Sequence, residues 1–250
     1  MTDESQCIPC HGKLSCTLCF PGPGQRIVAG PWQFQNDPGH WGSANPKILV
    51  LGFSKGATQV DVYNRGRFDD VAFAGSRQRL KASLVTLGLL MEHEDVNLRF
   101  RAEEKDFAFA SLIRCSVARM NGKSREPVTS GSIILKAFKE AGPRRLLDNC
   151  SKRFLTNLAD RLRLVVMLGV QDSYINHCRV LIGSLYDKEI RNINSVAYAT
   201  RQITWVHVTH PSPGNGWFDR WLVGDPNKIP VGRKREFAKE AIARISDLRR

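Results

Sequence analysis

The chain has 250 residues, of which 42% are hydrophobic and 24% charged, so it has the size of one globular domain and needs no disulfide bonds. Basic residues exceed acidic ones by 37 to 24, and this net charge of +13 favours a polyanionic partner such as nucleic acid. No stretch approaches the roughly 18 apolar residues that span a bilayer, and the acidic N-terminus lacks the pattern of a secretion signal. We therefore expect a cytoplasmic protein, of a bacterial-type cytosol and nucleoid, with no membrane partner.

Residues 1–46 are rich in cysteine, glycine and proline and show no regular hydrophobic spacing. We expect them to form an N-terminal lead-in tied by a metal, followed by the main domain over 47–250. Thiols stay reduced in the cytosol, so clustered cysteines indicate metal ligands before disulfide bonds. One tetrahedral zinc site can be built from the lead-in alone, with the ligands Cys7, Cys10, Cys16 and Cys19.

The main domain shows strands and helices in alternation. Apolar runs predict buried parallel strands at 47–53, 107–114, 162–169 and 203–210. Helical spacing of apolar residues predicts helices over 77–90, 144–162 and 233–250. This order is typical of an α/β fold, and we expect a three-layer α/β/α sandwich around a central, mainly parallel four-stranded sheet. Ligands bind such folds at the carboxyl ends of the strands.

Two short motifs follow the first predicted strand. "GFSKG" (52–56) begins with Gly52, which lets backbone approach a ligand closely, while successive N–H groups can cradle an anion or a carbonyl oxygen. "FAGS" (73–76) places Phe73 before a predicted helix, where an aromatic side chain can stack on a flat ring. A core role for Phe73 is the alternative interpretation.

Two further motifs follow later strands. The run ending at Cys115 leads into a basic loop with Asn121, an amide that can pair with a base edge while its basic neighbours bind phosphate. His210 ends the last strand, where a histidine can donate a hydrogen bond to a developing anion. The loop after it is stiffened by prolines and carries aromatic residues and an arginine, which suits insertion into a duplex.

Taken in order, these motifs resemble the uracil-DNA glycosylase superfamily, and most closely its iron–sulfur families four and five. The likeness spans about residues 16–222. It is carried by "CTLCFPGPGQR" (16–26), "ILVLGFSKG" (48–56), "FAGS" (73–76), "LIRCSVARMNGKSREP" (112–127), "NCSKRFLTNLADRLRLVVMLG" (149–169) and "HPSPGN" (210–215). Each motif is modest alone, but six in this order are specific.

The resemblance implies a structural 4Fe–4S cluster, which four cysteine thiolates can hold. The positions that match the family's ligands are Cys16, Cys19, Cys115 and Cys150. The zinc site within the lead-in stays open as the alternative, because Cys7 and Cys10 have no place in the family pattern.

The resemblance also implies a monofunctional, monomeric glycosylase that flips uracil out of single- or double-stranded DNA and hydrolyses its N-glycosidic bond, initiating base excision repair. His210 would stabilise the base anion. The base-binding residues would be Gly52, Phe53, Phe73, Ser111 and Asn121. The DNA-binding loop would use Pro211, Ser212, Pro213, Asn215, Trp217, Phe218 and Arg220, with Trp217 or Phe218 as the wedge.

The sequence departs from the family at two places. "GFSKG" has no acidic or amide residue to position water, and Ser111 stands where family four has a base-reading asparagine. About six extra residues precede "FAGS", so the water-positioning group could come from a wider set: Ser54, Asp61, Asn64, Asp69 or Asp70.

These departures leave alternative functions open. Ser111 could relax the preference for uracil and favour hypoxanthine or xanthine instead. The missing acid favours a protein that binds uracil or damaged DNA without turnover. An unrelated zinc-containing nucleic-acid module is a further alternative.

Overall fold

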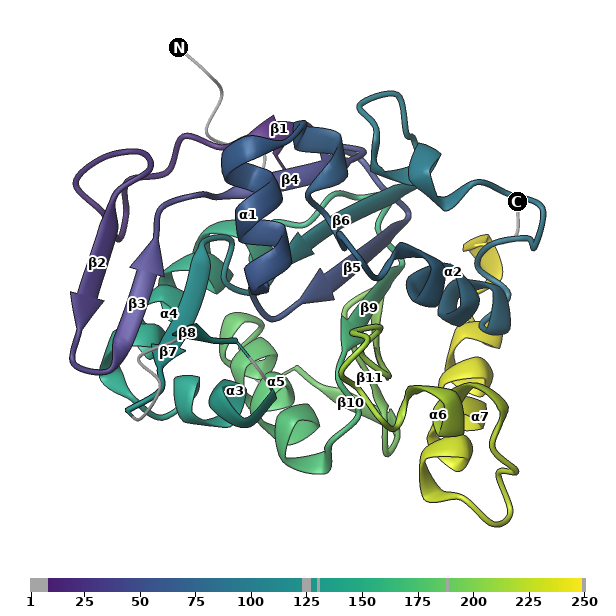
Figure 1. The fold of residues 1–250 in the computed structure, drawn as a ribbon. Helices are drawn as coiled ribbons and strands as arrows, with labels where there is room; N and C mark the ends of the chain where they lie inside the picture. Colours follow the sequence, from purple (N-terminus) through teal and green to yellow (C-terminus); the bar gives the residue numbers. More distant parts are fainter. Residues whose placement is uncertain (1–8, 123–126, 130, 188, 249–250) are drawn as a thin grey trace.

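The computed structural model describes residues 9–122, 127–129, 131–187 and 189–248, and Figure 1 shows their arrangement. The predicted α/β class is confirmed, with one large sheet and helices on both of its faces. The sheet has eight strands in the order β1-β4-β6-β5-β9-β12-β11-β10. Among the described residues, no helix is long and apolar enough to cross a membrane.

The four predicted strands form the centre of this sheet. They are β5 (Ile48–Gly52), β6 (Phe107–Ser111), β9 (Leu164–Leu168) and β12 (Ile203–Val208). Neighbours among them pair in parallel. Their residues are nearly all buried, because helices cover both faces, and this produces the continuous apolar runs in the sequence.

The prediction of a four-stranded sheet is wrong, because antiparallel strands extend both edges and make the sheet mixed. The strands β1 (Gly12–Lys13) and β4 (Gly39–Gly42) lie beyond β6, and β11 (Ala197–Thr200) and β10 (Arg191–Asn194) lie beyond β12. These strands have only two to four residues and include glycines and polar residues. Such short segments carry no hydrophobic period by which they could be predicted.

A second, antiparallel sheet joins the lead-in to the main domain. Its order is β2-β3-β7-β8, with β2 (Arg26–Ala29), β3 (Trp32–Gln35), β7 (Ser116–Met120) and β8 (Pro127–Val128). The hairpin between β2 and β3 turns at Gly30, whose φ of 57° is accessible to glycine without strain. Because β7 begins directly after Cys115, this sheet brings the lead-in beside that cysteine.

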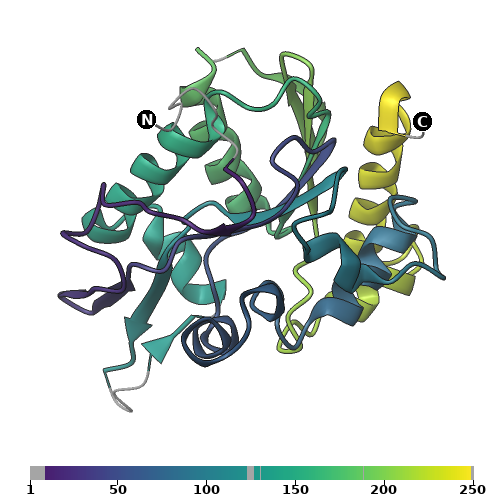
Figure 2. The ribbon, with the colours of Figure 1, turned by 90° about the horizontal axis from the view of Figure 1, so that it is seen from above.

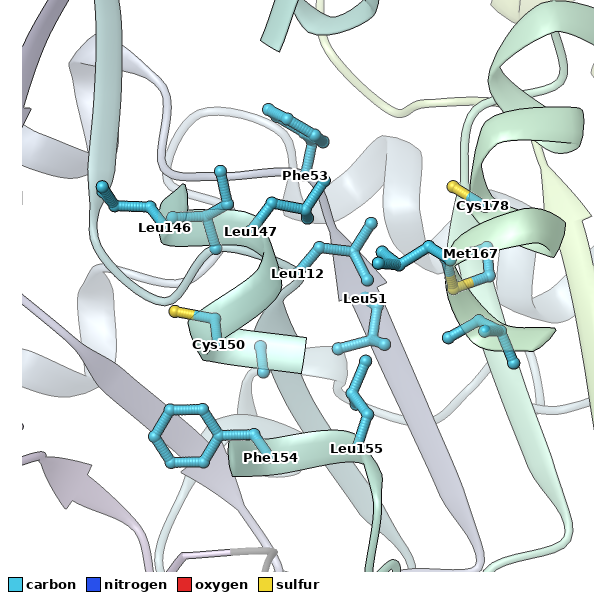
Figure 3. Close-up of a cluster of buried hydrophobic side chains, with 14 of the residues drawn as sticks. Leu51, Phe53, Leu112, Leu146, Leu147, Cys150, Phe154, Leu155, Met167 and Cys178 are labelled. Atoms are coloured by element: carbon cyan, nitrogen blue, oxygen red, sulfur yellow. The ribbon is translucent and has the colours of Figure 1, made fainter. Parts of the chain in front are cut away.

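Helices cover both faces of the large sheet (Figure 2). One face packs on α3 (Gly131–Ala137), α4 (Ala141–Leu155) and α5 (Asp172–Leu185). The other packs on α2 (Arg77–Thr86), α6 (Phe218–Val223) and α7 (Pro230–Ala243). Along β5, Leu49 and Leu51 face the first core, whereas Ile48 and Val50 face the second, which is the alternation of a strand. Figure 3 shows part of the first core, with Leu51 of β5 near Leu147 and Cys150 of α4.

The helices predicted over 77–90, 144–162 and 233–250 correspond to α2, α4 and α7, with different ends. The remaining elements are α1 (Ala57–Arg65) and the 3-10 turns η1 (Phe68–Asp70), η2 (Val96–Phe100) and η3 (Ser246–Leu248).

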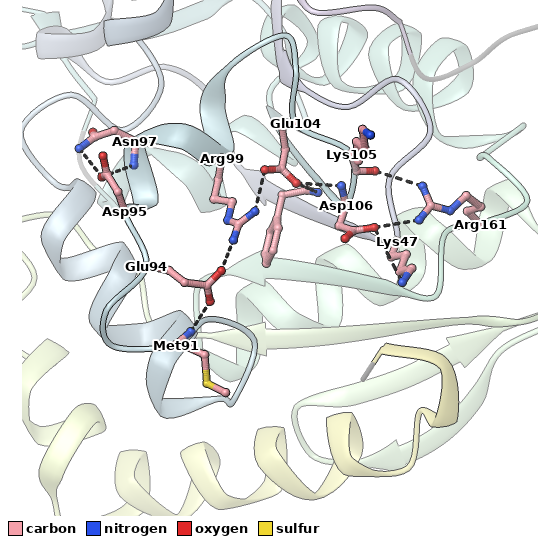
Figure 4. Close-up of polar contacts among 11 residues, drawn as sticks. Lys47, Met91, Glu94, Asp95, Asn97, Arg99, Glu104, Lys105, Asp106 and Arg161 are labelled. Carbon is pink, nitrogen blue, oxygen red and sulfur yellow. Dashed lines mark hydrogen bonds and ion pairs between the residues drawn. The ribbon is translucent and has the colours of Figure 1, made fainter. Parts of the chain in front are cut away.

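Charged residues join the amino ends of three central strands (Figure 4). Asp106, just before β6, accepts from Arg161 Nη2 at 2.8 Å, and its Oδ1 lies 3.8 Å from Lys47 Nζ. Lys47 precedes β5 and Arg161 precedes β9. Nearby, Arg99 of η2 pairs with Glu94 and with Glu104. These ion pairs lie at the end of the sheet opposite the predicted site.

Candidate active site

A small cavity, with room for about one water molecule, lies beyond the carboxyl ends of β5 and β6. Residues predicted for the site from separate motifs line it together: Gly52, Ser54, Phe73, Ser111 and His210. The structure therefore brings these motifs to one place, as expected at the carboxyl edge of parallel strands. The sequence analysis did not single out the other lining residues, which are Trp41, Gln59, Ala72, Phe109 and Ala110.

His210 has a defined tautomer in this cavity. Its Nδ1 accepts a hydrogen bond of 3.0 Å from the backbone N–H of Ser212. Burial lowers the pKa of His210 to about 4, so the ring is neutral near pH 7. A neutral imidazole that accepts at Nδ1 carries its proton on Nε2. His210 is thus prepared to donate a hydrogen bond from Nε2.

The loop after His210 is held by its own side chains. Asn215 donates from Nδ2 to the His210 carbonyl oxygen at 2.7 Å and to Thr209 Oγ1 at 3.0 Å. The Asn215 Oδ1 accepts from the backbone N–H of Trp217 at 3.1 Å. The predicted DNA contact at Asn215 therefore falls on a side chain whose amide already fixes the shape of the loop.

The two aromatic residues of this loop have different environments. Trp217 is 54% exposed, and the Arg220 guanidinium lies 5.0 Å from its ring centre. Phe218 is only 2% exposed, with the Arg79 guanidinium 4.1 Å from its ring centre. Trp217 is therefore the aromatic side chain accessible to a nucleic acid, while Phe218 belongs to the interior. Of the remaining loop residues, Pro211 is buried, Ser212 partly buried and Pro213 exposed.

Phe73 combines the two roles considered for it. It is buried, with its ring centre 6.1 Å from those of Phe100 and Phe109, and it also lines the cavity. Its φ of 55° lies in the left-handed region, which is unfavourable for a bulky residue. Such strained backbone is concentrated at functional sites. The next glycine, Gly75, also has a positive φ, of 73°, so the whole "FAGS" turn has a special conformation.

Several predicted residues do not line the cavity. Asp61 pairs with Arg65 on the surface of α1 at 3.1 Å, and Asp69 pairs with His11 at 3.0 Å. Asp70 is exposed in η1, and Asn64 accepts a hydrogen bond from Gln35 at 2.9 Å. The structure leaves these candidates for water positioning outside the cavity.

Two predicted base-binding residues are also elsewhere. Phe53 is buried against Phe138 in the core on the other face of the sheet. Figure 3 shows Phe53 in this core together with Leu147 of α4. Asn121 is exposed just after β7. An amide nevertheless reaches the cavity, because Gln59 of α1 lines it and is partly buried. In the sequence, Gln59 lies shortly after "GFSKG". The sequence analysis took Asp61, Asn64, Asp69 and Asp70 from this segment as candidates, but not Gln59.

A second small cavity is lined by the cysteines expected to hold a cluster: Cys16, Cys19, Cys115 and Cys150. They come from three separate segments of the chain. Cys16 and Cys19 lie in the lead-in, Cys115 lies between β6 and β7, and Cys150 lies in α4. Cys10 is exposed and does not line this cavity, while Cys7 lies outside the described residues. The zinc set within the lead-in is therefore not assembled by the residues that the structure describes.

The thiols in this cavity are free and not in the geometry of a single-ion site. In the described part of the chain, no three His, Cys, Asp or Glu side chains converge as ligands of one metal ion. A 4Fe–4S cluster binds each thiolate to a different iron, so its four sulfur ligands are spread around a larger volume. Four cysteines around one cavity match that donor set, and in this respect the residues fit the cluster.

Without a metal, the thiols of Cys115 and Cys150 are neutral near pH 7. Burial raises the pKa of Cys150 to about 11, although a hydrogen bond with the Arg114 backbone opposes the rise. Burial likewise raises the pKa of Cys115 well above its ordinary value, against the effect of Lys55. Iron would lower these pKa values, because metal-bound cysteine is thiolate.

A buried ion pair lies between the chain segments that line the two cavities. Lys55 of "GFSKG" is 1% exposed and lies 3.3 Å from the carboxylate of Asp37, which is fully buried. Asp37 accepts from the backbone N–H of Ser116 at 2.7 Å and from its hydroxyl at 2.5 Å. Ser116 follows Cys115, so the loop that carries Ser54 is bonded to the strand beside the cysteine cavity.

Comparisons with known proteins add no assignment. The chain matches no known protein-family model and no curated protein.

Proposed function

We propose that the protein is a monofunctional DNA glycosylase of the uracil-DNA glycosylase type. The observation that carries this proposal is the convergence of residues from four sequence motifs on one cavity, with a neutral His210 among them. The net charge of +13 and the exposed Trp217 beside Arg220 support a nucleic-acid partner.

The cavity offers the groups that cleavage of an extruded nucleotide needs. A base cannot react inside the duplex, so it must rotate out, and the exposed Trp217 would occupy the gap that it leaves. Phe73 would contact the flipped ring, while Ser111 and Gln59 would bind its polar edge. When the glycosidic bond breaks, the base leaves as an anion, and His210 donates from Nε2 to the developing charge. One such oriented donor contributes roughly 3 to 4 kcal/mol to transition-state stabilisation.

Water is positioned without a carboxylate in this proposal. None of the described residues that line the cavity is acidic. Ser54 and Gln59 are the polar side chains near the loop that normally supplies the water-positioning group. A hydroxyl and an amide orient water but accept its proton poorly, so we expect slow chemistry.

A 4Fe–4S cluster is proposed for the second cavity, held by Cys16, Cys19, Cys115 and Cys150. Its contribution would be structural, because it would join the lead-in to α4 and to the strand after Cys115. Through the ion pair of Lys55 with Asp37, the bound cluster would also stabilise the position of the active-site loop "GFSKG". Zinc bound within the lead-in by Cys7, Cys10, Cys16 and Cys19 is the alternative, and elemental analysis separates the two.

The first experiment is single-turnover incubation of the protein with an oligonucleotide that contains one uracil, followed by alkali and a gel. Strand scission at the uracil position is the expected result. The same strand with cytosine in place of uracil is the control. Parallel oligonucleotides with hypoxanthine or xanthine test whether Ser111 has changed the base preference.

A second candidate function is binding of damaged DNA without turnover, and the lack of a carboxylate among the described lining residues favours it. It would be established by a gel shift specific for uracil-containing DNA together with an intact strand after alkali. That result would contradict the glycosylase proposal, and it would show that the protein still binds uracil-containing DNA.

A further inference from the structure

Among the residues that the structure describes, Arg114 is a buried cation without an acidic partner. It is 2% exposed, and its guanidinium lies near His40 Nδ1, which is 3.4 Å from Nη1, and near the Phe154 ring, which is 4.9 Å from the guanidinium carbon. His40 is neutral, because burial lowers its pKa to about 3. The second terminal nitrogen, Nη2, has no hydrogen-bond partner among the described residues.

Such an arrangement is costly in a protein interior. A buried charge is normally paired, because loss of water costs several kcal/mol per ion. Lys55 shows the usual solution nearby, since its equally buried ammonium group pairs with Asp37. No carboxylate does the same for Arg114 in the described part of the chain. An anion is therefore missing from the environment of Arg114.

The cysteine cavity is the place where this anion can be. Arg114 lines that cavity together with all four cysteines, and no Asp or Glu is among the described lining residues. Four thiolates outweigh the positive charge of an iron–sulfide core, so a cysteine-ligated 4Fe–4S group is anionic overall. It would supply the charge that Arg114 lacks.

We propose that Arg114 is the buried counter-charge of the cysteine-ligated cluster and a positioning residue that sets both its retention and its reduction potential. This inference rests on the cluster of the proposed function. Reduction adds negative charge to the cluster, and a nearby fixed cation favours that state. Arg114 therefore raises the reduction potential, as charge and hydrogen bonding to sulfur do in such sites.

The decisive variant is Arg114→Met, which keeps a long side chain and removes the charge. In the cluster-loaded protein it should shift the midpoint potential to more negative values and weaken iron retention by about tenfold to a hundredfold. In the cluster-free protein it should raise the melting temperature, because an unpaired buried charge is removed. A purely structural arginine would change both forms in the same direction.

Arg153→Gln is the matched control. Its guanidinium carbon lies 5.7 Å from the centre of the same Phe154 ring, but Arg153 is exposed, so water screens its charge. We expect wild-type potential and retention for this variant. Arg114→Lys, which retains the charge, should keep the potential closer to that of the wild type than Arg114→Met does.

The measurements are iron and sulfide content, visible absorbance during a redox titration, and melting of loaded and cluster-free protein, all on the full chain reconstituted without oxygen. Wild-type protein that binds no iron would overturn the cluster proposal and this inference together. Iron in the wild type, with an unchanged potential and retention in Arg114→Met, would overturn the role of Arg114 alone. If Arg114→Met does not fold, Arg114→Gln, which also removes the charge, is compared with Arg114→Lys. A more negative potential and weaker iron retention in Arg114→Gln than in Arg114→Lys support the role of the charge, and equal values in the two variants reject it.

Discussion

The backbone N–H of Ser212 donates to Nδ1 of His210 across 3.0 Å, and this bond places the proton of the neutral ring on Nε2. Ser212 lies between Pro211 and Pro213. The loop that follows His210 therefore sets the tautomer of this histidine. The same loop presents Trp217 to solvent and buries Phe218. If the protein acts as proposed, the hydrogen bonding of His210 and the contact of Trp217 with DNA are therefore coupled through the backbone of this loop.

We predict that His210→Ala slows single-turnover cleavage of uracil DNA by roughly a hundredfold to a thousandfold, the usual effect of removing one oriented donor. Binding should change little, because the donor acts mainly on the charge that develops during bond cleavage. Rapid-quench kinetics and a binding titration on the same oligonucleotide measure the two effects. Equal losses in both would assign His210 to binding instead.

Substitution of Trp217 should affect DNA binding, whereas substitution of Phe218 should affect the stability of the fold. Trp217→Ala should weaken binding to uracil DNA and leave the melting temperature nearly unchanged, because the side chain is half exposed. Phe218→Ala should lower the free energy of unfolding by roughly 3 to 5 kcal/mol, as for other buried aromatic residues. Fluorescence titration and urea unfolding test the pair, and a stable Phe218→Ala with defective binding would reverse the assignment.

Gln59→Leu should slow cleavage by about fivefold to tenfold, corresponding to loss of one neutral hydrogen bond to the base or the water. Asp61→Asn, on the same helix but exposed beside Arg65, is the control and should cleave at the wild-type rate. Single-turnover rates on uracil and hypoxanthine substrates measure both variants. A severe defect in Asp61→Asn would show that α1 rearranges when DNA binds.

Loss of the Lys55 ammonium group should be strongly destabilising. Lys55→Met leaves Asp37 charged and buried, which costs roughly 3 to 5 kcal/mol, whereas Lys55→Met combined with Asp37→Asn should recover part of that loss. Chemical unfolding of the two single variants and the double variant gives the coupling free energy. Additive effects would show that the pair does not interact.

Buried histidines should make the protein sensitive to acid. Burial lowers the pKa of His40 and His207 to about 3 and of His210 to about 4, from an ordinary value of 6.5. Below pH 6.5 the unfolded chain binds protons that the folded protein does not, so stability falls as pH falls toward 4. Each histidine contributes a slope of up to about 1.4 kcal/mol per pH unit.

Urea unfolding at pH values between 7 and 4.5 tests this acid sensitivity. Replacing the exposed His93 with Gln should leave the pH dependence unchanged. His207→Asn should flatten it, because one of the buried neutral rings is gone. A free energy of unfolding that stays constant over this range would contradict the prediction.

The sequence by itself determined the centre of the fold, because β5, β6, β9 and β12 are buried on both faces and must be continuously apolar. It also singled out half of the residues that line the cavity. Of these, Gly52 and Ser111 end such strands and His210 lies just after one, whereas Ser54 and Phe73 come from the two motifs after β5. The cysteines Cys16, Cys19, Cys115 and Cys150 were grouped by resemblance, and the structure places them around one cavity.

Only the tertiary structure decided the rest. The edge strands β1, β4, β10 and β11 are defined by pairing with distant partners, and two to four residues carry no periodic signal. Whether a side chain faces a cavity or a core also depends on distant neighbours. That is why Gln59 lines the site and why Phe53 and Phe218 are interior residues. It is also why Arg114 lies buried beside four thiols, with no acid among the described lining residues to balance its charge.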